Sequence, residues 1–131
     1  MAEHPDVTLV RRGYEAFNNA DVATLSELIA DDATQHMVGD NLVSGDFKGR
    51  DAILGLYGRI AELTAGTYRV EILQTFTDGD GTGVVVHRQT ATRDGKQLDT
   101  VQALIFTILD GTVVDLHNTS DDPSIDDAFY S

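Results

Sequence analysis

The chain has 131 residues, of which 41% are hydrophobic and none is cysteine, and its formal net charge at pH 7 is -13. This length predicts one domain, residues 1–131, with a core of its own, and the lack of cysteine excludes disulfides, thiolate nucleophiles and cysteine-based metal sites. Because so negative a surface repels phosphate backbones and anionic lipids, neither nucleic acid nor a membrane is an expected partner.

The first half of the chain predicts helices. Residues 1–6 have neither a basic start nor an apolar run, so no signal peptide is predicted and a cytoplasmic location is expected. Apolar residues then recur at helical spacing in three segments. The expected bounds are residues 5–19, 21–32 and 51–66, with Asp21 and Asp51 as N-caps and Gly66 as a C-terminal stop. An extended stretch, residues 33–38, and a glycine-containing loop or hairpin, residues 39–49, separate the second helix from the third.

Two glycines, Gly55 and Gly58, lie inside the third predicted helix. Each of them costs about 1 kcal/mol relative to alanine in a helix interior. A close approach of this helix to a sheet is the expected reason for their presence.

The second half of the chain has a period of two, which is typical of strands. Four strands are expected at residues 68–77, 84–92, 98–109 and 113–119, joined by turns at residues 78–81, 94–95 and 110–111. The tail, residues 122–130, predicts a helical turn. Three helices followed by an antiparallel meander predict an α+β fold.

Acidic residues accumulate late in the chain. After Lys96 there is no lysine or arginine, and there are seven aspartates, at positions 99, 110, 115, 121, 122, 126 and 127. A solvated, solubilising face is the favoured interpretation. A cation site is the alternative, and the sequence lacks the glycine-containing calcium loop that would support it.

Five segments carry a family resemblance. In chain order they read YEAFNNADVATLSELIADDAT, GDFKGRDAI, TATRDGKQLD, LDGTVVD and DDPSIDDAFYS. This order resembles SnoaL-like proteins of the nuclear-transport-factor-two-like superfamily, which also holds ketosteroid isomerase, scytalone dehydratase and limonene epoxide hydrolase. The resemblance implies a cone-shaped, curved antiparallel or mixed sheet that, with three N-terminal helices, encloses an internal pocket. It also implies a homodimer formed through the outer face of the sheet.

The resemblance to ketosteroid isomerase implies which side chains face the pocket. The inward sets are residues 87, 89 and 91, residues 102, 104 and 106, and residues 116, 118 and 120. The substrate-binding candidates are Tyr14, Tyr57, Gln89, Gln102, Leu104, Phe106, Leu116 and Asn118. The outward set is Val84, Val86, Ile105 and Ile108. A slip of one residue would invert every face. For the two tyrosines, packing in the core is the alternative to a role in the site.

Three residues are candidates for catalysis: His87, His36 and Asp121. Histidine titrates near neutral pH and can move a proton in either direction, and a structural histidine is the alternative in both cases. His36 lies on the strand that carries the base of ketosteroid isomerase, but a length difference of one residue leaves its facing open. Asp121 or Asp122 lies near the aspartate that the resemblance to SnoaL-like cyclases implies, and capping of the terminal turn is the alternative.

The catalytic sets of the better-known relatives are not intact in this sequence. Met37 or His36 stands where ketosteroid isomerase has its base, Leu104 stands at its second acidic position, and the Arg-x-Asp pair of limonene-type epoxide hydrolases is absent. We therefore expect an isomerase, cyclase or dehydratase that uses histidine and no cofactor or metal on a small hydrophobic carbonyl or cyclic molecule. A non-catalytic ligand-binding protein and a dimeric interaction protein are the alternatives.

Overall fold

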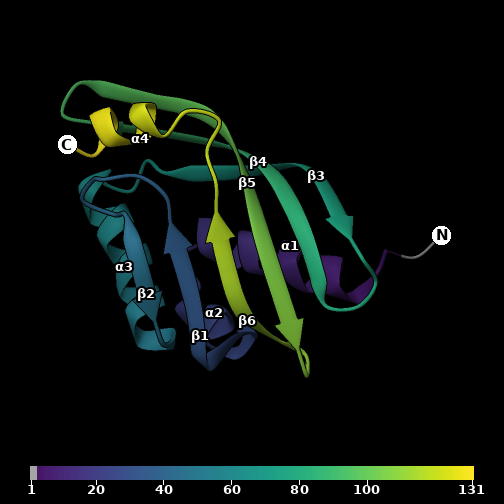
Figure 1. The fold of residues 1–131 in the computed structure, drawn as a ribbon. Coiled ribbons are helices and arrows are strands. Elements are labelled where there is room, and N and C mark those ends of the chain that lie inside the picture. Colours follow the sequence, from purple (N-terminus) through teal and green to yellow (C-terminus); the bar gives the residue numbers. More distant parts are fainter. Residues whose placement is uncertain (1–2) are drawn as a thin grey trace.

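The computed structural model describes residues 3–131 of the chain. Within this range the helices are α1 (Pro5–Asn18), α2 (Val22–Leu28), α3 (Arg50–Leu63) and α4 (Pro123–Phe129). The strands are β1 (Ile29–Met37), β2 (Gly45–Lys48), β3 (Arg69–Thr77), β4 (Thr82–Arg93), β5 (Lys96–Leu109) and β6 (Thr112–Asn118) (Figure 1). No helix of residues 3–131 is long and apolar enough to cross a membrane.

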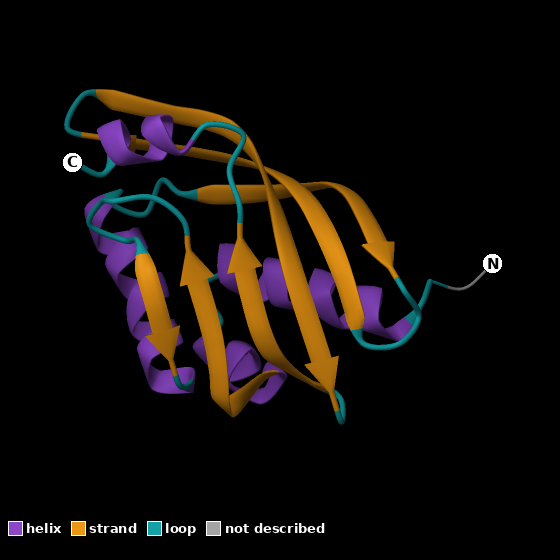
Figure 2. Cartoon of the chain, viewed as in Figure 1, coloured by secondary structure: helices purple, strands orange, loops and turns teal. Residues whose placement is uncertain are grey.

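The strands form one mixed sheet in the order β2-β1-β6-β5-β4-β3. The pairing of β1 with β6 is parallel, and the other neighbours run antiparallel. The sheet curves strongly, and α1, α2 and α3 lie against its concave side while α4 lies at one end of the long β4–β5 hairpin (Figure 2). The predicted α+β fold, with three N-terminal helices enclosed by a curved sheet, is confirmed.

Local sequence signals account for the starts of α1 and α2, but the predicted second helix, residues 21–32, is too long, because α2 ends at Leu28 and β1 begins at Ile29. Pro5 occupies the first turn of α1, and the Asp21 side chain caps α2 by accepting from the Thr24 backbone N–H at 3.2 Å. The predicted cap of α3 is wrong, because Gly49 with φ +94° is the N-cap and Asp51 lies in the first turn. A carboxylate is still favourable at that position, since it faces the positive end of the helix dipole.

The two glycines of α3 do not mark a close contact with the sheet, contrary to the prediction. A Cβ atom placed on Gly55 or Gly58 would meet no heavy atom within 4 Å, and both residues are exposed. The face of α3 that packs inward carries Ile53, Leu56 and Ile60 instead.

We therefore expect Gly55→Ala and Gly58→Ala each to raise the free energy of unfolding by about 0.5–1 kcal/mol, because alanine loses less backbone entropy in a helix. Urea denaturation followed by circular dichroism measures the change. The matched control is Gly66→Ala, which should destabilise the protein because Gly66 has φ +76°. A loss of stability at Gly55 and Gly58 as well would contradict this interpretation of α3.

The alternation of buried and exposed residues on β4, β5 and β6 agrees with the predicted inward parity. The inward residues that are buried are His87, Gln89, Ala91, Gln102, Leu104, Phe106, Leu116 and Asn118. Ser120 lies beyond the end of β6. The assignment of Ile108 to the outer face is wrong, because it has the same parity as Phe106 and packs in the same buried cluster. Val84, Val86 and Ile105 are partly or fully exposed on the outer face, as predicted.

Candidate functional site

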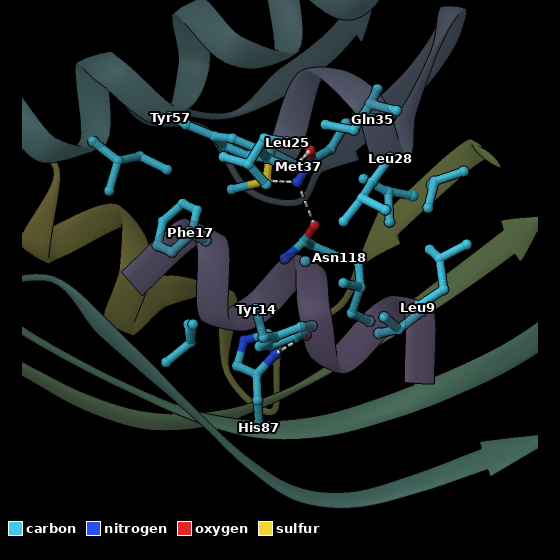
Figure 3. Close-up of a pocket in the computed structure, with 18 of the residues that line it drawn as sticks. Leu9, Tyr14, Phe17, Leu25, Leu28, Gln35, Met37, Tyr57, His87 and Asn118 are labelled. Atoms are coloured by element: carbon cyan, nitrogen blue, oxygen red, sulfur yellow. Dashed lines mark hydrogen bonds between the residues drawn. The ribbon is translucent and has the colours of Figure 1, made fainter. Parts of the chain in front are cut away.

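A cavity of about 100 Å³ lies between α1, α2, α3 and the concave side of the sheet. Its wall is mostly apolar, with Leu9, Phe17, Leu25, Leu28 and Met37 among the lining residues (Figure 3). Such a wall favours the burial of a hydrophobic ligand, and a few polar groups can then fix its orientation. Clefts for drug-sized ligands measure ~300–1,000 Å³, so this cavity suits a one-ring molecule, and a larger one requires the lining side chains to move.

The polar side of the cavity is built around His87. The Tyr14 hydroxyl on α1 lies 2.6 Å from His87 Nδ1, and His87 Nε2 lies 3.0 Å from Gln102 Oε1 on β5. The amide oxygen of Gln102 can only accept, so Nε2 carries the hydrogen and donates to it. In neutral His87 the Nδ1 atom then accepts from the Tyr14 hydroxyl. Figure 3 shows the Tyr14 hydroxyl and the His87 ring joined in this way.

Burial keeps both members of this pair uncharged at neutral pH. His87 is 2% exposed, and desolvation lowers its pKa below the ordinary value of 6.5. Burial also raises the pKa of Tyr14 well above its ordinary value. A neutral imidazole beside an undissociated phenol is a proton acceptor paired with a proton donor, which is the combination that general acid–base chemistry requires.

A second polar chain crosses the cavity from the opposite wall. The Tyr57 hydroxyl donates to Gln35 Oε1 at 2.6 Å, and Gln35 Nε2 donates to Asn118 Oδ1 at 3.0 Å. Asn118 ends this second chain and lines the cavity (Figure 3). Its amide nitrogen forms no hydrogen bond within residues 3–131. This nitrogen is therefore available to donate to a ligand oxygen.

The C-terminal helix adds a buried carboxylate that the sequence analysis did not single out. Asp126 on α4 is 5% exposed and accepts from Gln89 Nε2 at 2.7 Å and from Ser120 Oγ at 2.8 Å. Gln89 Oε1 in turn accepts from the Tyr68 hydroxyl at 2.6 Å. The spacing of Asp126, Phe129 and Tyr130, three and four residues apart, is the helical signal that could have identified this inward face.

The structure divides the predicted site residues into three groups. Those that line the main cavity are Tyr14, Tyr57, His87, Leu104, Leu116 and Asn118. Gln89 and Gln102 instead line a smaller, neighbouring cavity. Phe106 is fully buried in the core and lines neither of these two cavities.

Two predicted catalytic residues lie outside the main cavity. His36 points to the outer face of the sheet, where its Nδ1 lies 2.7 Å from Asp46 Oδ1 and its Nε2 lies 3.1 Å from Asp115 Oδ1. The hydrogen bond with Asp46, followed by that with Asp115, raises its pKa above 6.5. Asp121 is exposed, and the neighbouring Asp122 caps α4 by accepting from the Ser124 backbone N–H. The structure therefore places neither His36 nor Asp121 in the cavity that His87 lines.

The late aspartates do not gather into a cation site. Within residues 3–131, no three histidine, aspartate or glutamate side chains are arranged to hold a metal ion. Asp115 pairs with His36, Asp99 pairs with Arg88, and Asp126 accepts from neutral donors.

Comparisons with known proteins identify similar sequences and folds. Residues 10–116 match the model of the SnoaL-like domain. The chain is 31% identical to an uncharacterized protein of Mycobacterium tuberculosis over 131 residues, which is 100% of both chains. It is 37% identical to Bal32a from a soil-derived mobile gene cassette, with a TM-score of 0.95 and 97% of each chain covered. It is 25% identical to a putative polyketide cyclase from Sinorhizobium meliloti, with a TM-score of 0.72 and 86% of this chain and 94% of that one covered.

Proposed function

The chain belongs to the SnoaL-like domain family of nuclear-transport-factor-two-like proteins, and we propose that it is an enzyme that moves a proton on a small hydrophobic carbonyl or phenol. The observation that carries this proposal is the neutral Tyr14–His87–Gln102 chain at the wall of an apolar cavity. Isomerisation and aldol-type cyclisation both need such a proton transfer next to a carbonyl. The similarity to a putative polyketide cyclase supports the same class of reaction.

The proposed step uses the two members of the pair in turn. A ligand carbonyl oxygen entering the cavity competes for the Tyr14 hydroxyl hydrogen, which turns away from His87 to donate to the ligand. His87 Nδ1 is then free to take a proton from the carbon beside the carbonyl. The electrons of that C–H bond form the enolate, whose negatively charged oxygen is stabilised by hydrogen bonds from the Tyr14 hydroxyl and the Asn118 amide nitrogen, while His87 holds the proton as an imidazolium. Return of the proton to a different atom of the ligand completes an isomerisation.

A ligand-binding protein without catalysis is the second candidate. In the structure His87 already satisfies both of its ring nitrogens within the chain, through Tyr14 and Gln102. If both contacts persist when a ligand is bound, His87 takes up no proton, and the polar wall only orients the bound molecule. The two candidates are separated by the exchange of hydrogen for deuterium beside the carbonyl of a bound ketone, because only a protein that moves a proton accelerates that exchange.

We also propose a homodimer formed through the outer face of the sheet. Apolar side chains are exposed there on β5, at Val101, Ile105 and Leu109. Burial of apolar side chains against a second copy would remove them from water. Sedimentation equilibrium measures the mass in solution, and a monomer at micromolar concentration would rule this partner out.

The proposed site is tested by NMR titration of the histidine ring signals with one-ring ketones and phenols. The His87 signal should titrate below pH 6.5 and should shift on ligand addition, because the ligand displaces the Tyr14 hydroxyl. His36 is the internal control. Its signal should titrate above pH 6.5, and it should not shift on ligand addition, because His36 lies on the outer face. A His87 signal that responds to no ligand would exclude His87 from the working site.

A further inference from the structure

A second, smaller cavity of about 20 Å³ lies beneath α4, next to the main one. Met37, Ile60, Tyr68 and Asn118 border both cavities. The smaller cavity differs in its chemistry, because its wall also carries Gln89, Gln102, Asp126 and Tyr130. A volume of this size holds one water molecule or one hydroxyl group.

Tyr130 points to a missing partner in this cavity. Its side chain is 3% exposed, and its hydroxyl is the one buried side-chain polar atom of residues 3–131 that has no hydrogen-bond partner. Buried hydroxyls almost always have a partner in the protein or an ordered water. Burial and the nearby Asp126 raise the pKa of Tyr130, so the group stays an undissociated donor.

The other residues that line the small cavity have hydrogen-bond donors and acceptors that are not fully used. The amide nitrogens of Gln102 and Asn118 donate to no group within residues 3–131, since only their oxygens form hydrogen bonds. Asp126 accepts one hydrogen bond on each carboxylate oxygen, and each oxygen can accept another. Asp126 has no salt bridge to a cation in the described residues.

We propose that the cavity under α4 binds a hydroxyl group of the ligand. This hydroxyl accepts a hydrogen bond from the Tyr130 hydroxyl and donates its own hydrogen to Asp126. This deepens the proposed function and rests on it, because a second oxygen on the ligand would bridge from the Tyr14–His87 pair to α4. The substrate class is a small ring with two oxygen functions, one at each polar wall. A water molecule occupies the oxygen position when no ligand is bound.

Gln102 joins the two polar walls. Its oxygen accepts from His87 Nε2, and the residue also lines the small cavity. An oxygen in that cavity that accepts from the Gln102 amide nitrogen would fix the amide in the orientation that sets the hydrogen on His87 Nε2. Occupation of the small cavity would in this way keep Nδ1 available as the acceptor.

The test compares the binding of phenol with that of catechol, resorcinol and hydroquinone by calorimetry. At least one dihydroxybenzene should bind roughly tenfold more tightly than phenol to the unaltered protein, because it adds a hydrogen bond to a charged group. Tyr130→Phe and Asp126→Asn should each remove most of that advantage and leave the affinity for phenol unchanged. Thr64→Val, which removes a paired buried hydroxyl outside both cavities, is the control and should preserve the advantage.

Tyr130→Phe removes an unpaired hydroxyl and should fold normally, which keeps the comparison valid. Phenol binding with no preference for any dihydroxybenzene would overturn the inference and leave the proposed function standing. Phenol binding that survives Tyr14→Phe unchanged would instead count against the proposed function. If none of the probes binds, a crystal structure decides: an oxygen beside Tyr130 Oη supports the oxygen site, and an empty cavity overturns it.

Discussion

Replacing Phe106 with alanine is expected to lower the free energy of unfolding by about 3–5 kcal/mol. The Phe106 ring, on β5, is fully buried and belongs to the same core cluster as Val10, Val85 and Leu116. Domains are typically stable by only about 5–15 kcal/mol, so the variant loses a large part of its stability. Urea denaturation followed by circular dichroism measures the difference.

The neighbouring strand explains why no other side chain can refill the space. Gly83 on β4 lies opposite Phe106, and a Cβ atom on Gly83 would collide with the Phe106 ring and with the Phe76 backbone carbonyl. The ring therefore covers bare backbone, and its removal leaves a cavity that the rigid sheet cannot close.

The matched control for Phe106 is Ile105→Ala on the same strand. Ile105 is 39% exposed and faces outward, so its truncation should cost about 1 kcal/mol or less in the monomer. Equal losses at the two positions would show that the sheet does not have the inward parity described here.

Replacing His87 with glutamine is expected to slow proton exchange on a bound ketone by roughly 10²–10⁴-fold, the usual contribution of a general acid or base. Glutamine keeps a hydrogen-bonding group between Tyr14 and Gln102 but has no nitrogen that can take a proton. The measurement is the loss of the hydrogens beside the carbonyl of cyclohexanone or a related one-ring ketone in D₂O, followed by NMR.

The same substitution at His36 provides the control. His36→Gln should leave the exchange rate unchanged, because His36 lies on the outer face between Asp46 and Asp115. Tyr14→Phe should reduce the rate by about 10²–10³-fold, since it removes the donor to the carbonyl oxygen. A folded His87→Gln protein with full activity would exclude His87 as the base.

The pH dependence of this exchange follows from the direction of the His87 pKa shift. The neutral imidazole is the active form, so the rate should be at its plateau at neutral pH and fall as His87 becomes protonated. Because burial lowers the pKa of His87 below 6.5, the half-maximal rate should occur below pH 6.5. The outer-face His36, whose pKa is raised, would give a midpoint above pH 6.5 if it were the base.

Short-range features of the sequence determined much of the fold. Asp94-Gly95 and Asp110-Gly111 adopt the positive φ angles that tight hairpins require, so the strands on either side pair as predicted. The resemblance to ketosteroid isomerase implied that His87 and Gln102 face inward, and this parity holds along β4 and β5 because their antiparallel ladder is regular from end to end.

Parity could not be predicted where the ladder is irregular. The register of β1 against β6 shifts between Ile29 and Thr34, so the facing of His36 cannot be counted from the sequence. Gln35 and Met37 both line the cavity, so His36 between them faces the opposite side of the sheet.

The composition is a property of the sequence alone. The hairpin turns and the starts of α1 and α2 could also be predicted from it, because each depends on residues only a few positions apart. The meeting of Gln89 with Asp126 joins residues 37 positions apart, and that of Tyr14 with His87 joins residues 73 apart. Only the docking of α1 and α4 onto the curved sheet brings these groups within hydrogen-bond distance. The tertiary structure therefore decided which polar residues form the site, since no local pattern records which distant faces pack together.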